Sequence, residues 1–303
     1  MSSSNGSVNY DHSGGTYVGM SQRQQAEYER LRLQHELHKR AMSGELVRVP
    51  LSKTQPLRIL DSATGDGLWM LDVSKQYPLA SFVGTDLFPN HFKQLRNLPA
   101  SISFKTQSVL DDWPDEDSNA YDLVHQRHCI GQFSPEKAAA IIKRLFNLVK
   151  PGGYLQIVEA SNAHFDGGKK YVYMERAMDY LVKIFAEFGI TASPGPSAAG
   201  WMREAGVVDI REEVLSIPIG VKAVTPEDQT ATTANILNII DNFAAVGSKN
   251  PNHWFTPDDF KALREGLVEE LATNGNTWRF WVVTGRKPAQ GPVYNFIDGY
   301  SKM

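Results

Sequence analysis

The sequence predicts an α/β fold built around one open, mostly parallel β-sheet with helices on both faces. Short apolar runs typical of strands alternate with helical patterns between residues 57 and 158, and this alternation favours a parallel sheet. A last apolar run, Trp278–Thr284, follows a reversal of the chain and suits a final strand that runs antiparallel. Helical stretches interrupt the strands beyond residue 160, so we expect helical insertions over one edge of the sheet.

The individual elements follow from apolar periodicity and turn residues. Strands are expected at 57–60, 81–86, 102–106, 121–125, 154–158, 207–219 and 278–284. Helices are expected at 21–43, 68–76, 135–149, 170–188, 201–205, 227–245 and 257–272. Ser134 is the expected N-cap of the helix 135–149, with Pro135 in its first position. Two prolines and a glycine in Ser193–Pro196 exclude regular structure there.

The composition is that of an ordinary globular protein, with 42% hydrophobic and 21% charged residues and a net charge of -3. No basic run interleaved with aromatic residues is present, so we expect no nucleic-acid partner. No apolar stretch is long enough to span a bilayer, and no His/Cys/Asp cluster has metal-ligand spacing. The single cysteine, Cys129, excludes an intrachain disulfide and fits a reducing compartment, so the expected location is the cytoplasm.

Two predicted strands end in acidic residues, Asp61 and Asp86, at the edge where open parallel sheets bind ligands. Between them lies the turn Ala63–Gly67, whose small residues allow the backbone to approach a ligand closely. Asp86 is placed to accept hydrogen bonds from the ribose hydroxyls of an adenosine. Together these features predict a nucleoside site.

The same turn distinguishes between nucleosides. A dinucleotide fingerprint requires a third glycine where Met70 stands, and Asp61 and Asp66 would repel a pyrophosphate. S-adenosylmethionine (SAM) has no phosphate and carries a sulfonium and an ammonium cation, which acidic residues attract. The sequence therefore favours SAM as cofactor over NAD.

The motifs resemble a known class of enzymes. The segment Asp61–Gly67 resembles the Asp/Glu-x-Gly-x-Gly-x-Gly motif of class I methyltransferases, with Ala63 in place of its first glycine. Pro151–Gly153 resembles their turn before a strand. Tyr28–His35 and Asp122–Arg127 resemble the fungal secondary-metabolite methyltransferases, among them the gliotoxin-type N-methyltransferases. The expected fold is therefore the Rossmann-like class I methyltransferase sheet, with helical lid insertions.

This resemblance implies a division of the chain. It predicts a disordered tail at 1–16, an N-terminal helical cap at 17–50 and a SAM-binding core at 51–160. The remainder, 161–303, would complete the domain with closing strands and a substrate lid, for which we expect segments 161–200 and 225–273.

The resemblance also implies cofactor-binding residues after four strands. They are Asp61, Ala63 and Gly65 along the methionine part, Asp86 and Leu87 at the ribose, Ser108 and Val109 beside the adenine, and Gln126 and Arg127 under the sulfonium and carboxylate. From the helical cap, Gln34 and His35 are candidates to close over the SAM carboxylate, and Tyr28 to stack on the cofactor. The alternatives are an ordinary polar helix face and simple packing.

Catalytic candidates follow the fourth and fifth strands. His125 and His128 bracket Gln126 and Arg127, and a histidine near neutrality is suited to take the proton released on methylation. Glu159 ends the next strand at the same edge. The alternative is that these side chains face the core or only line the pocket.

Trp201 and Trp254, together with His128, are candidate walls of a substrate pocket; for both tryptophans, core or surface packing is the alternative. The expected function is SAM-dependent methyl transfer to N, O or S of a small, largely apolar secondary metabolite. Two alternatives stay open: a methyltransferase-like regulator acting through protein partners, and a SAM-binding enzyme of rearrangement or cyclisation chemistry. The sequence leaves the oligomeric state open.

Overall fold

The computed structural model describes residues 24–89, 98–247 and 253–289. Its strands form one seven-stranded sheet in the order β3-β2-β1-β4-β5-β7-β6. The strands are β1 Arg58–Ser62, β2 Ser81–Asp86, β3 Ile102–Thr106, β4 Tyr121–Arg127, β5 Val149–Ala160, β6 Val208–Ile219 and β7 Asn276–Arg286. Pairings among β1 to β5 are parallel, and β7 runs antiparallel to both β5 and β6. The predicted sheet, including its antiparallel last strand, is confirmed.

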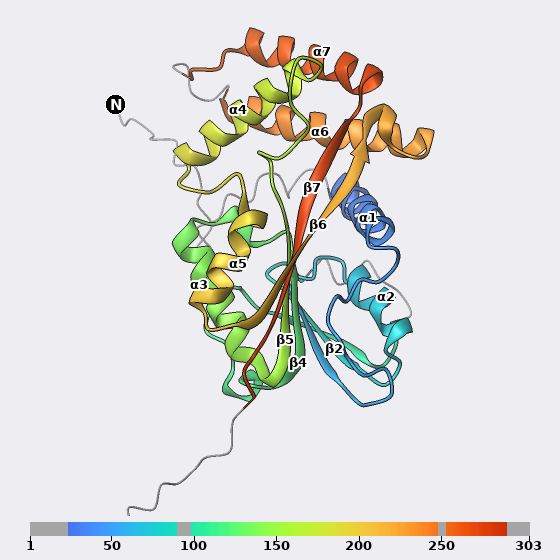
Figure 1. Cartoon of the computed structure of the whole chain (residues 1–303), viewed down its shortest axis with the longest axis vertical. Helices are drawn as coiled ribbons and strands as arrows, with labels where there is room; N and C mark the ends of the chain where they lie inside the picture. Colours follow the sequence, from blue (N-terminus) through green and yellow to red (C-terminus); the bar gives the residue numbers. More distant parts are fainter. Residues whose placement is uncertain (1–23, 90–97, 248–252, 290–303) are drawn as a thin grey trace, which may run out of the picture.

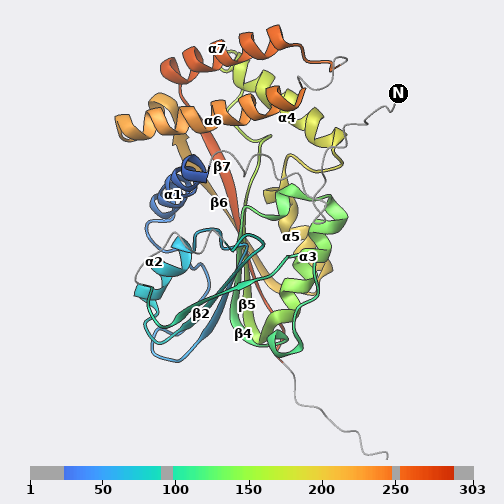
Figure 2. The same ribbon diagram turned by 180° about the vertical axis from the view of Figure 1, so that it is seen from behind.

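Helices surround this sheet on three sides (Figures 1 and 2). Within the described residues they are α1 Gln24–Ala41, α2 Leu68–Gln76, α3 Pro135–Leu148, α4 Val172–Glu187, α5 Pro194–Glu204, α6 Pro226–Gly247 and α7 Pro257–Thr273. Helices α3 and α5 cover one face, while α1 and α2 cover the other. Helices α4, α6 and α7 stack beyond the carboxyl ends of the parallel strands. They lie in the segments that we expect to form the lid.

Helix α3 illustrates how local sequence specifies an element. The Ser134 hydroxyl accepts a hydrogen bond from the Lys137 N–H, and Pro135 occupies the first turn, as expected. Its buried side chains recur at helical spacing and face the sheet: Ala138, Ile141, Ile142, Leu145, Phe146 and Leu148. Burial of this apolar stripe stabilises α3 against β4 and β5.

The expectation of irregular structure at Ser193–Pro196 is wrong. Helix α5 begins at Pro194, so both prolines lie in its first turn, where backbone N–H groups have no partner within a helix. Gly195 permits the close approach of this turn to the sheet, since an added Cβ would lie 2.7 Å from both the Glu159 carbonyl oxygen and the Trp281 ring. The prolines and the glycine therefore start a helix rather than prevent one.

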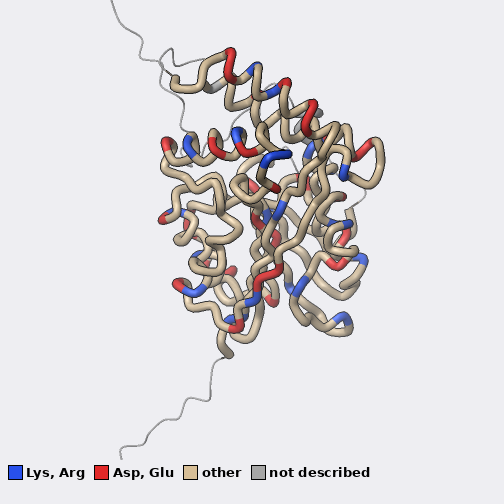
Figure 3. The backbone as a smooth tube through the Cα atoms, turned by 45° about the horizontal axis from the view of Figure 1, so that its top comes forward, with Lys and Arg blue, Asp and Glu red and all other residues tan. Residues whose placement is uncertain are grey.

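Within the part of the chain that the structure describes, no helix is long and apolar enough to cross a membrane. Basic and acidic residues are mixed along the backbone, without one long segment of a single sign (Figure 3). The expected tail, 1–16, lies outside the described residues. The cytoplasmic location and the absence of a nucleic-acid partner stay predictions.

Candidate functional site

The carboxyl ends of β1, β2, β4 and β5 meet at one edge of the sheet, where ligands bind in open parallel sheets. In the register of β1 and β4, Asp61 pairs with His125, so Arg127 lies beside the turn that follows β1. Helix α1 covers this turn. The Cδ1 atom of Leu31 lies 3.8 Å from the point where a Cβ on Gly65 would be. The result is a site between a sheet edge and the N-terminal helix.

The turn after β1 needs left-handed backbone at three positions. Ala63, Gly65 and Gly67 have φ angles of 53°, 59° and 79°. The Thr64 N–H donates to the Thr85 carbonyl oxygen at 2.8 Å and ties the turn to β2. Ala63 therefore keeps the conformation that explains a glycine at this place in the class I motif, although it carries a Cβ.

Ala63→Gly is expected to stabilise the fold by up to about 1.5 kcal/mol. The left-handed conformation costs an L-residue roughly 1–2 kcal/mol, while the extra freedom of glycine in the unfolded chain costs about 0.5–1 kcal/mol. Urea denaturation measures the change. Ala140→Gly is a matched control, because Ala140 is an exposed residue inside α3, where glycine costs about 1 kcal/mol. Equal destabilisation by both changes would contradict the backbone argument.

Asp61 is held in a defined orientation beneath the turn. Its side chain is buried, and Oδ1 lies 2.7 Å from His125 Nδ1, while the Thr64 hydroxyl donates to Oδ2 at 2.6 Å. The Trp69 ring stacks on His125 at a centroid distance of 3.9 Å. Burial lowers the pKa of His125, so the imidazole is neutral at pH 7 and its Nδ1–H donates to the carboxylate. His125 thus orients Asp61 and does not reach the open edge.

Asp86 links the end of β2 to the same turn. Its Oδ2 accepts the Gly65 N–H at 2.9 Å, and its Oδ1 accepts the Phe88 N–H at 3.0 Å. Leu87 follows as a half-buried residue. The carboxylate therefore lies over the edge of the sheet, held by two backbone N–H groups.

Ser108 and Val109 lie just after β3, where both are half-buried. The Ser108 hydroxyl accepts the Leu110 N–H at 3.2 Å. Val109 packs against the core on the α3 and α5 face of the sheet. The structure brings them to the same edge as Asp86, because β3 pairs in parallel with β2.

Gln126 and Arg127, at the end of β4, have unused bonding capacity. Gln126 is fully buried; its Nε2 donates to the Ser62 hydroxyl at 3.2 Å, but its Oε1 has no partner among the described residues. The Arg127 guanidinium lies 3.4 Å from His35 Nδ1, and within the described residues no carboxylate forms an ion pair with it. Burial lowers the pKa of Arg127 and the nearby Asp61 opposes this, so the group stays a cation.

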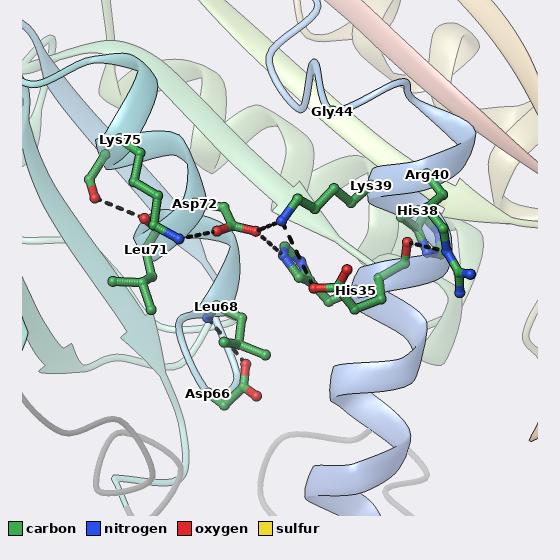
Figure 4. A network of polar contacts seen from close by, with 12 residues as sticks. His35, His38, Lys39, Arg40, Gly44, Asp66, Leu68, Leu71, Asp72 and Lys75 are labelled. Atoms are coloured by element: carbon green, nitrogen blue, oxygen red, sulfur yellow. Dashed lines mark hydrogen bonds and ion pairs between the residues drawn. The ribbon is translucent and has the colours of Figure 1, made fainter. Parts of the chain in front are cut away.

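Hydrogen bonds and ion pairs to Asp72 connect helix α1 to α2 (Figure 4). His35 Nε2 and Lys39 Nζ lie 3.0 and 2.7 Å from Oδ2, and Lys75 Nζ lies 2.7 Å from Oδ1. Burial opposes ionisation of Asp72, but these hydrogen bonds outweigh it and lower the pKa of its carboxyl. His35, Glu36 and Asp72 also have ligand atoms within 4.8 Å of one another, but the Lys39 ammonium already supplies the positive charge there.

His35 connects this network to the site. Burial and the nearby Arg127 lower its pKa, so its ring is neutral at pH 7. Its Nε2–H then donates to Asp72, and its Nδ1 accepts from Arg127. Gln34 is half-buried beside it, and the side chain of Tyr28 lies outside the described residues. The structure therefore places His35 of α1 next to Arg127, and its contact with the SAM carboxylate stays a prediction.

His128 and Glu159 face each other at the ends of β4 and β5. His128 Nδ1 lies 3.9 Å from Glu159 Oε2, and the His128 side chain keeps 17% of its surface exposed. Glu159 Oε1 accepts the N–H groups of Cys129 and Ile130 at 2.7 and 2.8 Å. Burial raises the pKa of Glu159 to about 8, although the backbone N–H groups of Cys129, Ile130 and Gly131 oppose this. Burial also holds the pKa of His128 well below its usual value, so both groups are uncharged at neutral pH.

The two tryptophans expected in a substrate pocket lie in different parts of the molecule. Trp201 is 9% exposed and packs in the core on the α3 and α5 face. Trp254 is 42% exposed; its Nε1 donates to Glu187 at 2.6 Å, and Lys183 Nζ lies 5.4 Å from its ring centroid. Neither ring contacts His128 in the described structure. The alternatives stated for them, core packing for Trp201 and surface packing for Trp254, describe their placement.

Two residues that contact His128 are not among those predicted from the sequence. Trp278 of β7 stacks on the His128 ring at a centroid distance of 5.8 Å and an interplanar angle of 16°. His38 Nε2 of α1 lies 2.9 Å from His128 Nε2. His38 is identifiable from the sequence because it follows His35 by three residues, which places both side chains on the same face of the helix.

Known proteins match this chain in sequence and in fold. Residues 59–153 match a family model described as a methyltransferase domain. The N-methyltransferase tcpN of Claviceps purpurea is 34% identical over 273 residues, which cover 89% of this chain and 97% of that protein. The N-methyltransferase gliN of Aspergillus fumigatus is 33% identical over 267 residues, 86% of this chain and 94% of that protein.

A solved structure shares the fold of this chain. A methyltransferase structure solved in complex with the Haloferax volcanii Trm112 methyltransferase activator superposes with a TM-score of 0.51 at 15% identity, covering 87% of this chain and 95% of that one. The strand order with one antiparallel strand and the acidic turn after β1 are present in the chain itself. The chain therefore belongs to the class I SAM-dependent methyltransferases, in the family of the fungal N-methyltransferases tcpN and gliN.

Proposed function

We propose that this methyltransferase transfers the methyl group of SAM to a nitrogen atom of a small, largely apolar secondary metabolite. The proposal rests on three groups of different charge that lie together at one edge of the sheet. They are the Arg127 cation without a carboxylate partner in the described chain, the oriented carboxylate of Asp86, and the neutral ring of His128. The nitrogen assignment draws on relatives named N-methyltransferases.

The residues present fit SAM in charge and in hydrogen bonding. Arg127 complements the cofactor's carboxylate, and the buried Oε1 of Gln126 offers its ammonium group an acceptor that is unused in the described structure. The Asp86 carboxylate lies at the end of β2, where carboxylate oxygens can accept hydrogen bonds from ribose hydroxyls. Asp61, held by His125 and Thr64, places a negative charge beneath the turn, where the cationic part would lie. A pyrophosphate would meet two carboxylates here instead.

When bound, SAM supplies a methyl group on an activated leaving group, so the chain has to position the acceptor and remove a proton. His128 is suited to this task because it is uncharged at neutral pH and partly exposed at the edge. Glu159, protonated near pH 7, adds no negative charge beside an approaching neutral amine. Helix α1 covers the turn and limits the access of water.

The lid helices favour an apolar acceptor. A small cavity lies between α4 and α6 above the end of β5, and its lining is almost wholly apolar. The residues that line it are Asn162, Phe165, Met174, Ala177, Met178, Leu181, Ile236, Ile239 and Ile240. Methionine side chains adapt to irregular shapes, which suits a region that opens around a substrate.

The nitrogen assignment is tested with matched acceptors. Purified protein is incubated with SAM that carries a deuterated methyl group, in the presence of tryptamine and phenethylamine or of their alcohol and thiol analogues. Mass spectrometry should find the label in the amines, together with S-adenosylhomocysteine. Label in the alcohols or thiols alone would overturn the nitrogen assignment. Binding of S-adenosylhomocysteine with no labelled product would count against methyl transfer and favour the regulator or the cyclisation enzyme.

A further inference from the structure

Helix α1 carries a fully buried imidazole, His38, that the proposed chemistry does not use. Its Nε2 lies 2.9 Å from His128 Nε2, and its Nδ1 lies 2.7 Å from the carbonyl oxygen of Gln34. Phe280 and Trp278 of β7 enclose the ring at centroid distances of 4.2 and 5.7 Å. The two imidazoles are thus held between α1, the end of β4 and β7.

The hydrogen bonds determine where the protons are. A carbonyl oxygen only accepts, so His38 Nδ1 carries a hydrogen. Burial lowers the pKa of His38 to about 3, and the ring is therefore neutral at pH 7 with a lone pair on Nε2. His128 Nε2 must then be the donor in the contact between the two rings. Since His128 is neutral as well, its Nδ1 has the free lone pair.

The backbone of His128 shows that its position is imposed by tertiary contacts. Its φ is 52°, in the left-handed region that a residue with a side chain rarely adopts. Its N–H donates to the Val158 carbonyl oxygen at 2.9 Å, and Trp278 stacks on its ring. Such strain is typical of residues held for a function rather than for local stability.

We propose that His38 is a positioning residue for methyl transfer: its bond to His128 Nε2 keeps the proton there and leaves the His128 Nδ1 lone pair available to the acceptor. The inference rests on the proposed role of His128 as proton acceptor. In the step itself, the acceptor nitrogen forms a bond to the methyl carbon while the carbon–sulfur bond breaks and its electron pair stays on sulfur. The acceptor's proton moves to His128 Nδ1. The resulting imidazolium then donates a charge-assisted hydrogen bond to neutral His38.

This assignment joins cofactor binding to proton transfer through one helix. His35 and His38 are three residues apart on α1 and face the same side. One contacts Arg127 and the other His128, which are consecutive at the end of β4. The packing of α1 therefore orients both Arg127, which we assign to cofactor binding, and His128, which we assign to proton transfer from the acceptor.

The test compares three variants on α1. His38→Gln keeps an acceptor near the Nε2 position, and His38→Leu removes it at similar volume. Arg40→Gln is the control, because it breaks the ion pair of α1 with Asp228 on α6 without touching His128. Imidazole nitrogen NMR reports the His128 tautomer with and without S-adenosylhomocysteine. Turnover is measured with the panel amine that is methylated fastest, and S-adenosylhomocysteine affinity by calorimetry.

We expect wild-type His128 to show a protonated Nε2 and an unprotonated Nδ1. His38→Leu should produce a mixture of the two His128 tautomers. It should also lower kcat about 10- to 100-fold, which is part of the roughly 10²- to 10⁴-fold rate enhancement that a positioned base contributes. S-adenosylhomocysteine affinity should change little. His38→Gln should restore much of kcat, and Arg40→Gln should retain it.

Two results would overturn the inference: a wild-type His128 protonated at Nδ1, which needs no variant to fold, or an unchanged tautomer and kcat in His38→Leu. The role of His128 is tested separately with His128→Ala. Full activity in His128→Ala would reject the base itself. Loss of activity in His128→Ala together with normal activity in His38→Leu would reject only the positioning role of His38.

Discussion

Asp86→Asn is expected to weaken S-adenosylhomocysteine binding by about 10- to 150-fold, which corresponds to the roughly 1.5–3 kcal/mol of a hydrogen bond to a charged group. The carboxylate accepts the Gly65 N–H on one oxygen and the Phe88 N–H on the other. An amide has only one acceptor oxygen, so its NH₂ group would face one of these two donors. The substitution therefore removes the charge proposed to bind the ribose and also disturbs the turn after β1.

Calorimetry with S-adenosylhomocysteine measures this effect. Asp111→Asn is the matched control, because Asp111 is an exposed carboxylate on the loop after the neighbouring strand β3. Circular dichroism should show that both variants fold. Equal affinities of Asp86→Asn and the wild type would show that Asp86 does not bind the nucleoside, and would contradict the cofactor assignment.

Glu159→Gln is expected to flatten the dependence of stability on pH between about 4.5 and 8. In the native protein burial raises the pKa of Glu159 from its ordinary value of 4.5 to about 8. Between these values the unfolded chain loses this proton and the native chain keeps it, so stability falls as pH rises. At about 1.4 kcal/mol per pH unit, the loss is on the order of 5 kcal/mol once both states are ionised. Glutamine has no proton to lose, and its Oε1 can still accept the Cys129 and Ile130 N–H groups.

Urea unfolding of both proteins from pH 5 to pH 9 measures this difference. The free energy of unfolding of Glu159→Gln should exceed that of the wild type by a difference that grows as pH rises and becomes constant above pH 8. Glu116→Gln, which removes an exposed carboxyl near the start of β4, should leave the pH dependence unchanged. Parallel curves for wild type and Glu159→Gln would show that the Glu159 carboxyl is already ionised in the native protein at low pH.

The sheet was predictable because its signals are local. Helix α2 and strands β2 and β3 have the expected bounds, 68–76, 81–86 and 102–106, since each is an apolar run closed by turn residues. β4 and β5 extend beyond the expected 121–125 and 154–158, to Arg127 and from Val149. The error at Pro194 has a different origin. Proline breaks a helix in its interior but not in its first turn, where the backbone N–H groups have no partner within the helix.

The cofactor edge was also accessible from sequence. Parallel strands bring their carboxyl ends together whatever the details of packing, so Asp61, Asp86 and Arg127 are placed at one edge by topology. The positive φ of Ala63 is likewise implied by the motif position it occupies. Chemical type, strand end and order along the chain were sufficient for these residues.

By itself, the sequence determined the sheet, the acidic turn and the preference for a cationic nucleoside, because these depend on neighbours along the chain and on strand direction. Tertiary structure alone decided that His125 orients Asp61, that His38 contacts His128, and that Trp254 is exposed beside Glu187. The contact between His38 and His128 spans 90 residues. Such contacts depend on how α1 and β7 pack against the sheet, and side-chain packing across distant segments is not encoded in any local pattern.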